Sequence, residues 1–162
     1  MFGVSFGLHY LCTMEEKDIQ FDFRNVPKTW QVCFLSECPV KEQCLRQLAA
    51  KNMPADRDWG AAVYPTMQRN EKGCRLFATG NPKRMAWGFN TLFSEVKAKH
   101  ENVLRLAMKN YLHGHAVYYR YNRGEKLLSP EQQEWIVQLF QSMGYHDGLE
   151  FDHYVYAYDF DH

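Results

Sequence analysis

The stretch "SPEQQEWIVQLFQSMG", residues 129–144, carries the signals of one amphipathic helix. Ser129 is a good N-cap residue, Pro130 fits the first helical position, and Gln132 can complete a capping box. Apolar residues then recur at helical spacing before Gly144, and they are Trp135, Ile136, Leu139, Phe140 and Met143. The stretch therefore predicts a helix with one apolar face, which needs a core to pack against.

The neighbouring sequence predicts further helices and strands around such a core. Residues 100–112 carry a broad apolar face, and residues 83–98 also have a helical pattern. "HAVYYRY" (115–121) predicts an aromatic strand, and "NRGE" (122–125) predicts a turn. "EFDHYVYAYDF" (150–160) alternates as a long strand would.

Shorter strands are predicted in the first half of the chain. "TWQVCFL" (29–35) alternates as a short strand. "DWGAAVYP" (58–65) and "GCRLFATGNP" (73–82) are bounded by Gly or Pro, and the turn sequence "QRNEKG" (68–73) makes a hairpin plausible. Strands and helices interleave without a regular βαβ series. The predicted class is therefore α+β, a single compact domain with a small antiparallel sheet and about four helices.

The length and composition limit the class of protein. No apolar run approaches the roughly 18 residues that a membrane span needs. "MFGVSFGLHYLC" (1–12) lacks the basic start and cleavage site of a secretory signal, and Met14 resembles a natural chain start. An N-terminal extension is possible over residues 1–13, and the domain is expected over 14–162. The odd number of five cysteines fits a reducing compartment, which predicts a cytoplasmic protein.

Cysteines form the main candidate site. Thiolates are the ligands of tetrahedral zinc sites and of iron–sulfur clusters, so a Zn or Fe–S site is one hypothesis. A helix is predicted from Pro39 to about Asn52 with a cysteine as its cap, where the helix dipole favours the thiolate for metal binding or redox chemistry. The four candidate ligands are Cys33, Cys38, Cys44 and Cys74, and Cys38 is the predicted cap.

The same cysteines also fit an ordinary protein core. Free cysteine is among the most buried residue types. Cys44 lies on the apolar stripe of its predicted helix, between Val40 and Leu48. The spacings between the cysteines lack the close C-x2-C pair that is typical of zinc motifs. Metal binding, buried structural thiols and thiol redox chemistry are therefore three open hypotheses.

Charge is distributed unevenly along the chain. Residues 69–126 hold 12 Lys and Arg against 4 Asp and Glu, whereas residues 127–162 hold none against 7. A basic face could bind an anionic partner, either nucleic acid or an acidic protein. Aromatic residues nearby could stack on bases, and they are Trp87, Phe89, Tyr118 and Tyr121. Alternatively, the acidic end packs against the basic middle and neutralises it. The candidate partner-binding residues are Arg69, Lys72, Arg75, Lys83, Arg84, Arg120 and Arg123.

Two smaller groups of residues have ligand or catalytic side chains. His113 and His115 flank Gly114 and would need a nucleophilic cysteine to form a catalytic dyad, but no nucleophile motif accompanies them. The acidic end of the chain carries residue types that can ligate a metal ion, although such chain ends are usually solvated. Those residues are Asp152, His153, Asp159, Asp161 and His162.

Two resemblances add to these predictions. "CPVKEQCLRQLAA" (38–50) resembles a segment of the WhiB-like iron–sulfur regulators, and "DWGA" (58–61) resembles their tryptophan–glycine turn. This resemblance implies that Cys38 and Cys44 are paired cluster ligands, with Cys12 as the upstream ligand. From Met14 onward the chain resembles a domain of unknown function found in short bacterial proteins of gut anaerobes. The stretches that carry the second resemblance are "CFLSECPVKEQCLRQLA" and "GEKLLSPEQQEWIVQLFQSMGY", and it implies a cytoplasmic bacterial protein.

The sequence thus predicts a non-enzymatic cytoplasmic bacterial domain with a four-cysteine Zn or Fe–S site and an anionic partner on its basic face. The first alternative is a metal-free structural or protein-interaction module with buried cysteines. The second is a redox enzyme that uses Cys38 as its reactive thiol. No membrane partner is expected, and the sequence does not indicate an oligomeric state.

Overall fold

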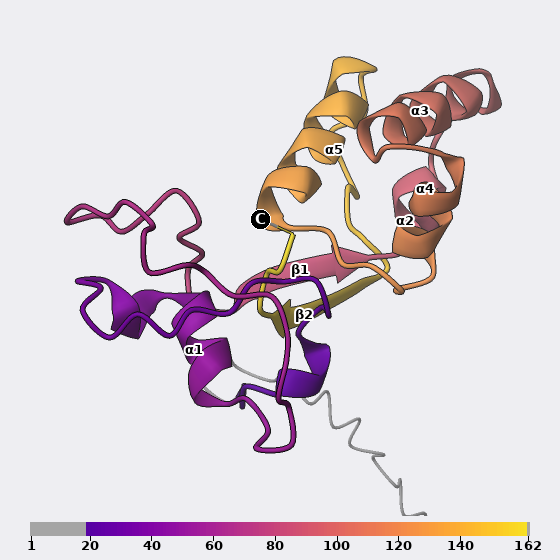
Figure 1. Ribbon diagram of the computed structural model, residues 1–162. Helices are drawn as coiled ribbons and strands as arrows, with labels where there is room; N and C mark the ends of the chain where they lie inside the picture. The colour runs from indigo at the N-terminus through magenta and orange to yellow at the C-terminus, as the bar shows by residue number, and fades with distance from the viewer. Residues whose placement is uncertain (1–18, 162) are drawn as a thin grey trace, which may run out of the picture.

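The computed structural model describes residues 19–161, which form two lobes joined by a two-stranded sheet (Figure 1). The first lobe contains residues 19–82 and the chain end 158–161, and the second lobe contains residues 88–152. Within these residues no helix is long and apolar enough to cross a membrane. The α+β class is confirmed. The helices and strands are α1 (Leu45–Lys51), β1 (Lys83–Trp87), α2 (Asn90–Phe93), α3 (Ala98–Tyr111), α4 (His115–Asn122), α5 (Pro130–Ser142) and β2 (His153–Ala157).

Strand β1 lies at the centre of the molecule because both of its edges are hydrogen-bonded. On one edge it pairs with β2 in antiparallel register, from Lys83 opposite Ala157 to Trp87 opposite His153. On the other edge Ala86 exchanges backbone hydrogen bonds with Leu128, at N–O distances of 3.1 and 2.8 Å. The chain therefore passes beside β1 immediately before α5 and again at its end.

Helix α5 confirms the prediction from its capping sequence. Gln132 N donates to Ser129 Oγ at 3.3 Å, and Ser129 N donates to Gln132 Oε1 at 3.0 Å, which completes the capping box. Gly144 follows the helix with a φ of 89°, a conformation that glycine adopts without strain. The helix predicted over residues 100–112 is also confirmed, because α3 covers Ala98–Tyr111.

The helix predicted over residues 83–98 is wrong, because residues 83–87 form β1. Gly88 ends the strand with a φ of 84°, and a Cβ atom there would lie 2.6 Å from the Cβ of Asp152. Helix α2 then begins two residues later. Pairing with a strand far away in the sequence outweighs the local helical pattern at this position.

The strand predicted over residues 115–121 is also wrong, because these residues lie in α4. Tyr118 and Tyr121 are both buried, and their three-residue spacing brings them to one face of a helix. Gly114 caps α4 with a φ of 128°, so the chain can start a new helix directly after α3. The high strand propensity of tyrosine is overridden by tertiary packing.

The short strands predicted in the first lobe do not form. The segment 29–35 contacts residues 58–65 through one parallel bridge, Val32 to Ala62, and the segment 73–82 meets Cys44 in an antiparallel bridge at Thr79. The turn predicted at 68–73 is present. The first lobe is therefore built mainly from irregular backbone.

Helix α1 begins at Leu45 rather than at Pro39, and its N-cap is Cys44 instead of Cys38. The delay has a backbone cause, because Leu45 N donates to Ala78 O at 2.7 Å. Residues before Cys44 form only a short 3₁₀ turn. The predicted end near Asn52 is confirmed, since Asn52 is the C-cap.

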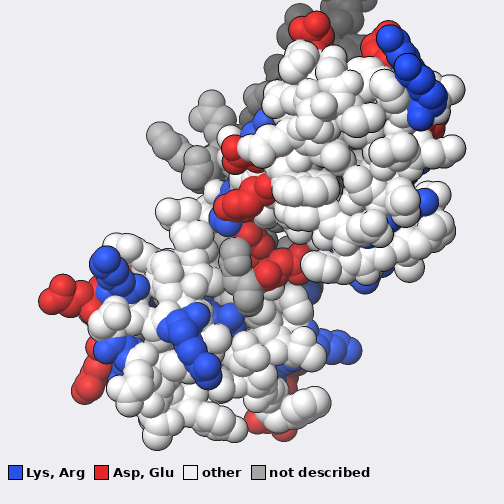
Figure 2. Space-filling model, turned by 90° about the horizontal axis from the view of Figure 1, so that it is seen from above, with Lys and Arg blue, Asp and Glu red and all other residues white. Residues whose placement is uncertain are grey.

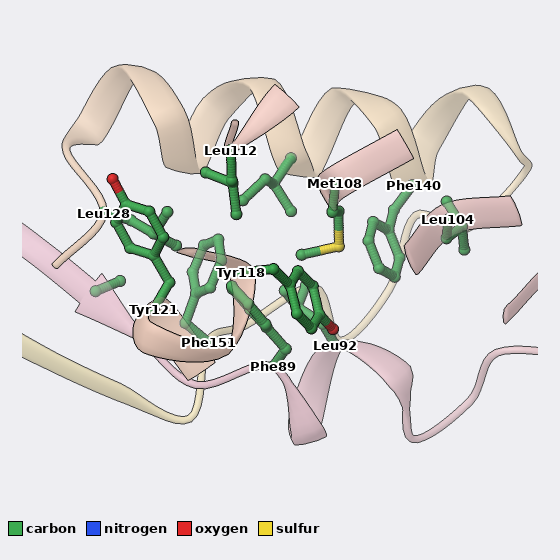
Figure 3. Packing of buried hydrophobic residues seen from close by; sticks show 12 residues of the cluster. Phe89, Leu92, Leu104, Met108, Leu112, Tyr118, Tyr121, Leu128, Phe140 and Phe151 are labelled. Atoms are coloured by element: carbon green, nitrogen blue, oxygen red, sulfur yellow. The ribbon is translucent and has the colours of Figure 1, made fainter. Parts of the chain in front are cut away.

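The second lobe encloses the larger hydrophobic core (Figure 3). Its side chains point toward one another from separate elements, with Met108 from α3, Tyr118 from α4 and Phe140 from α5 (Figure 3). Phe89 follows β1 and lies 4.9 Å from the ring centre of Tyr118. The core thus joins β1 to the helices of this lobe.

The first lobe has a smaller core, which the chain end completes. Among the residues that the structure describes, its buried side chains are Val26, Trp30, Val32, Leu45, Ala49 and Ala78. Phe160 packs against them, with its ring edge-on to Trp30 at 5.1 Å between centroids. Beside it the nearly buried carboxylate of Asp159 lies 3.1 Å from Lys83 Nζ. The residues after β2 therefore belong to the first lobe.

Asp152 caps α2 from a distant part of the chain. Its carboxylate accepts hydrogen bonds from Thr91 N at 2.7 Å and from Asn90 N at 3.0 Å. Partial burial by itself raises the pKa of Asp152, but these hydrogen bonds outweigh burial and hold the pKa below its ordinary value.

We expect Asp152→Ala to lower the free energy of unfolding by about 1 kcal/mol at neutral pH, as the loss of a helix cap does. Because the folded-state pKa is lowered, the contribution is complete above the ordinary aspartate pKa of about 3.9. It is lost as the pH falls through the folded-state pKa. Urea unfolding from neutral to acid pH should show the two proteins converging, and Asp147→Ala, at an exposed site, is the control. A difference that stays constant with pH would contradict this role.

Candidate functional site

Three of the four predicted ligand cysteines are buried, and all four are free thiols. Cys33, Cys38 and Cys44 are buried, whereas Cys74 is partly exposed. Within residues 19–161, no group of three or more His, Cys, Asp or Glu side chains is placed to hold a metal ion. Cys12 lies outside the described residues. The four-cysteine site thus stays a hypothesis to which the geometry adds nothing.

The cysteine segments surround a buried arginine that the sequence analysis did not identify. Arg46 is 2% exposed, and its guanidinium group donates to Leu76 O at 2.6 Å and to Gln31 O at 2.8 Å. Burial lowers the pKa of Arg46, and the nearby thiols act in the opposite direction. Those thiols are Cys44, Cys74 and Cys33.

The thiol of Cys33 takes part in the same packing. Gln47 Nε2 donates to Cys33 Sγ at 3.5 Å and to Leu35 O at 2.7 Å. The backbone N–H of Cys33 donates to Arg46 O. Together with Arg46, these hydrogen bonds tie α1 to the chain before and after it. The buried cysteines therefore belong to the packed interior of the first lobe.

The described histidines of the predicted sites have structural contacts in the second lobe and in the sheet, and His162 lies outside the described residues. His115 starts α4 and lies 4.8 Å from the ring of Tyr119, and His113 occupies the turn before it. His153 stacks on Trp87 at 3.8 Å between ring centroids. The described cysteines all lie in the first lobe, so the fold does not unite them with these histidines.

Much of the predicted basic face is neutralised by neighbouring carboxylates. Lys83 Nζ lies 3.1 Å from Asp159 and 3.4 Å from Glu131, and both acids belong to the acidic last part of the chain. Arg120 and Arg123 both pair with Glu125. Figure 2 shows acidic and basic side chains together where the two lobes meet. The pairs of Lys83 agree with neutralisation by the acidic end of the chain, whereas the acid beside Arg120 and Arg123 belongs to the basic middle itself.

Arg84 is also engaged, because its guanidinium group lies 3.6 Å from the ring centre of Tyr154. Contact with a π face is favourable for a cation. The aromatic residues proposed to stack on bases are engaged as well, since Phe89, Tyr118 and Tyr121 are buried in the core. The stacking prediction for these three side chains is wrong.

Three predicted cations remain available on the loop of the first lobe. Arg69, Lys72 and Arg75 line one open hollow of about 370 Å³, and none forms an ion pair with a residue of the described chain. The hollow surrounds a tight turn in which Asn70 and Gly73 exchange backbone hydrogen bonds of 2.9 Å. The turn therefore holds the three cations together on a defined loop.

The turn depends on Gly73. Its φ is 101°, and a Cβ atom there would lie 2.8 Å from a methyl carbon of Val40. Lys72 N donates to Asn70 Oδ1 at 2.9 Å, which orients the next residues of the turn. The sequence "QRNEKG" predicted a turn at residues 68–73, and this prediction is confirmed.

Two further hollows of the first lobe share lining residues, one with the cationic hollow and the other with that neighbour. The middle hollow shares Gln68 and Arg75 with the cationic one and is lined by Tyr64 and Met67. The last one shares Ala62 with the middle hollow. We call the three together the aromatic–basic track. Figure 2 shows Lys and Arg side chains gathered on the first lobe.

Large aromatic side chains lie exposed beside this track. Trp59 is 85% exposed, Tyr64 is 77% exposed and Phe34 is 55% exposed. The parallel bridge from Val32 to Ala62 brings their two segments side by side. Clustered exposed aromatics are typical of binding surfaces. These three side chains were not among the predicted binding residues, although "DWGAAVYP" carries two of them and its flanking Pro and Asp indicate a loop.

The fold and the track define a small two-lobed α+β domain with a candidate binding surface on its irregular lobe. The chain belongs to the family of unknown function DUF6078, which it matches over residues 14–160. Curated proteins show no match to it, and neither do solved structures.

Serine substitutions separate core thiols from metal ligands. We expect Cys44→Ser to lower the free energy of unfolding by about 1–3 kcal/mol, because it places a hydroxyl in a buried site. Cys74→Ser at its partly exposed position should change it by less than about 0.5 kcal/mol. Urea unfolding of both variants under reducing conditions measures the difference. Large and equal losses at both positions would contradict the core role and indicate a shared metal site.

Proposed function

We propose that this domain is a non-enzymatic cytoplasmic bacterial protein that binds single-stranded nucleic acid along the aromatic–basic track. The observation that carries the proposal is the arrangement of Arg69, Lys72 and Arg75 around one hollow, next to a second hollow that shares Arg75 with it and is lined by the exposed ring of Tyr64. Phosphates contact the cations, and bases stack on the aromatics.

The electrostatic part of the proposal depends on cations that are free to meet a phosphate. Elsewhere the predicted basic residues have partners, such as Lys83 with Asp159 and Arg123 with Glu125. Arg69, Lys72 and Arg75 have no carboxylate partner among residues 19–161. A phosphate backbone neutralises such a group and releases its counterions, which supplies affinity without sequence preference.

The aromatic residues favour nucleic acid over an acidic protein. An acidic protein would use the cations but would have no specific use for flat rings beside them. Single-stranded nucleic acid uses both, because every base has a face that stacks on an aromatic ring. Trp59 and Tyr64 are largely exposed, so their rings are not used in the core. An unpaired strand also follows an open hollow more easily than a duplex does.

The two lobes have different roles in this proposal. The second lobe and β1 supply the larger core and hold the chain end in place. The first lobe supplies the binding surface from loops, as many binding proteins do. In this proposal the buried cysteines and Arg46 hold those loops in shape.

The test is the salt dependence of binding to fluorescein-labelled oligothymidine of about 12 nucleotides, a length within the usual site size of one domain. The triple variant Arg69→Ala, Lys72→Ala, Arg75→Ala should bind more weakly than the wild type. Its plot of log affinity against log salt should be shallower by about 2, because each single-strand phosphate contact contributes about 0.7 to the slope. Fluorescence anisotropy measures both quantities.

A matched control removes the same charge from the second lobe. The variant Lys99→Ala, Arg120→Ala, Arg123→Ala lies away from the track and should keep the wild-type slope. If the two triple variants lose affinity equally, binding follows total charge and the track is not the site. If the wild type does not bind the oligonucleotide at low salt, the proposal is wrong.

A further inference from the structure

We propose that the outer edge of β2 is an interface at which two copies of this chain pair in solution. Among the described residues the sheet consists of β1 and β2 alone, so β1 occupies one edge of β2 and no described strand occupies the other (Figure 1). A strand edge carries a row of backbone donors and acceptors that another chain can use. The inference does not depend on the binding of nucleic acid.

The pairing of β1 determines which backbone groups of β2 point toward the outer edge. Ala86 exchanges its backbone hydrogen bonds with Leu128, on the side of β1 that faces away from β2. Hydrogen-bonded and non-hydrogen-bonded pairs alternate along an antiparallel ladder, so Ala86 and Tyr154 form a non-hydrogen-bonded pair. The N–H and C=O groups of Tyr154 therefore point outward, and those of Tyr156, two residues later, do the same.

These outward groups are available for pairing. Neither Tyr154 nor Tyr156 exchanges a backbone hydrogen bond with a described segment outside the sheet. The middle of the strand also lies at the surface, because Tyr154 is 36% exposed and Val155 is 39% exposed. The outer edge of β2 therefore presents backbone donors and acceptors beside exposed apolar side chains.

The outer edge is complementary to itself. A two-fold axis through Val155 places two β2 strands antiparallel, with Tyr154 of each copy opposite Tyr156 of the other. In this register every outward N–H and C=O group of these tyrosines has a partner. Val155 faces its own copy on one side of the sheet, and the tyrosines face each other on the opposite side. Such β-branched and aromatic cross-strand pairs are favourable.

Charge does not oppose the pairing of two copies. Edge strands usually carry a charged residue, a proline or a bulge that prevents pairing with another chain. Residues 153–157 contain no Asp, Glu, Lys, Arg or Pro, and their register with β1 is continuous. The flanking acids, Asp152 and Asp159, lie opposite aromatic residues in the two-fold register and do not face each other. A neutral edge with matched outward groups therefore fits an identical edge.

The experiment is sedimentation velocity of the full chain at protein concentrations from about 1 to about 300 μM, because a short strand pair predicts a weak dimer. Tyr156→Pro removes an outward N–H and leaves the N–H groups that donate to β1 in place. It should raise the concentration at which half of the protein is dimeric by about tenfold or more. Tyr156→Phe keeps the N–H and is the matched control, which should dimerise as the wild type does.

A second variant carries the test if Tyr156→Pro fails to fold. Val155→Lys places two like charges opposite each other across the two-fold axis, and it should also weaken the dimer. Thermal melting confirms that each variant folds. Hydrogen exchange locates the contact, because the amides of Tyr154 and Tyr156 should exchange more slowly as the wild-type concentration increases.

Three results would overturn the inference. The first is a wild type that stays monomeric at the highest concentration. The second is a dimer that folded Tyr156→Pro and Val155→Lys leave unchanged, because the contact then lies elsewhere. The third is protection of the Tyr154 and Tyr156 amides in the monomer, which would mean that another part of the same chain covers this edge. Oligothymidine binding is measured separately, so either proposal can fail while the other stands.

Discussion

The pairing of β1 with β2 is the constraint on which the rest of the molecule depends. It brings residues 153–157 back to residues 83–87 and leaves the following residues beside the first lobe. Phe160 then packs against Trp30, and Asp159 lies against Lys83 at 3.1 Å. Removing one partner of a nearly buried ion pair strongly destabilises the fold, because it leaves the other charge buried without its partner. The first lobe is therefore completed by the last residues of the chain, and the position of Trp30 depends on them.

The two lobes solve the problem of stability in different ways. The second lobe buries aromatic and aliphatic side chains between helices, as Figure 3 shows. Among its described residues the first lobe has one α-helix, of seven residues, two short 3₁₀ helices and otherwise irregular backbone. It is held by directed contacts, above all those of Arg46 to Leu76 and Gln31. Such backbone can present large side chains to solvent, as it does with Trp59, which a closely packed helix or strand would bury.

Local signals explain which parts of the fold could be predicted from the sequence. Helix α5 was predictable because its capping box and its apolar spacing lie within one stretch. Residues 83–87 were mistaken for helix because β2, which fixes them as a strand, lies far away in the sequence. Residues 115–121 were mistaken for a strand because tyrosine favours strands, whereas burial of Tyr118 and Tyr121 favours a helix. For the site, the loop cations were predicted from the sequence. The pairing of Lys83 with Asp159 and the hollow beside Trp30 were not, because they form only when distant parts of the chain come together.

The most direct test of this account is an amide ¹H–¹⁵N NMR spectrum recorded while oligothymidine is added. Binding along the track predicts shifts that cluster in residues 30–34 and 57–76. The amide signals of α3, α4 and α5 should not shift, because these helices lie in the second lobe (Figure 1). Shifts centred on α3 to α5, or a spectrum that does not change, would contradict the account.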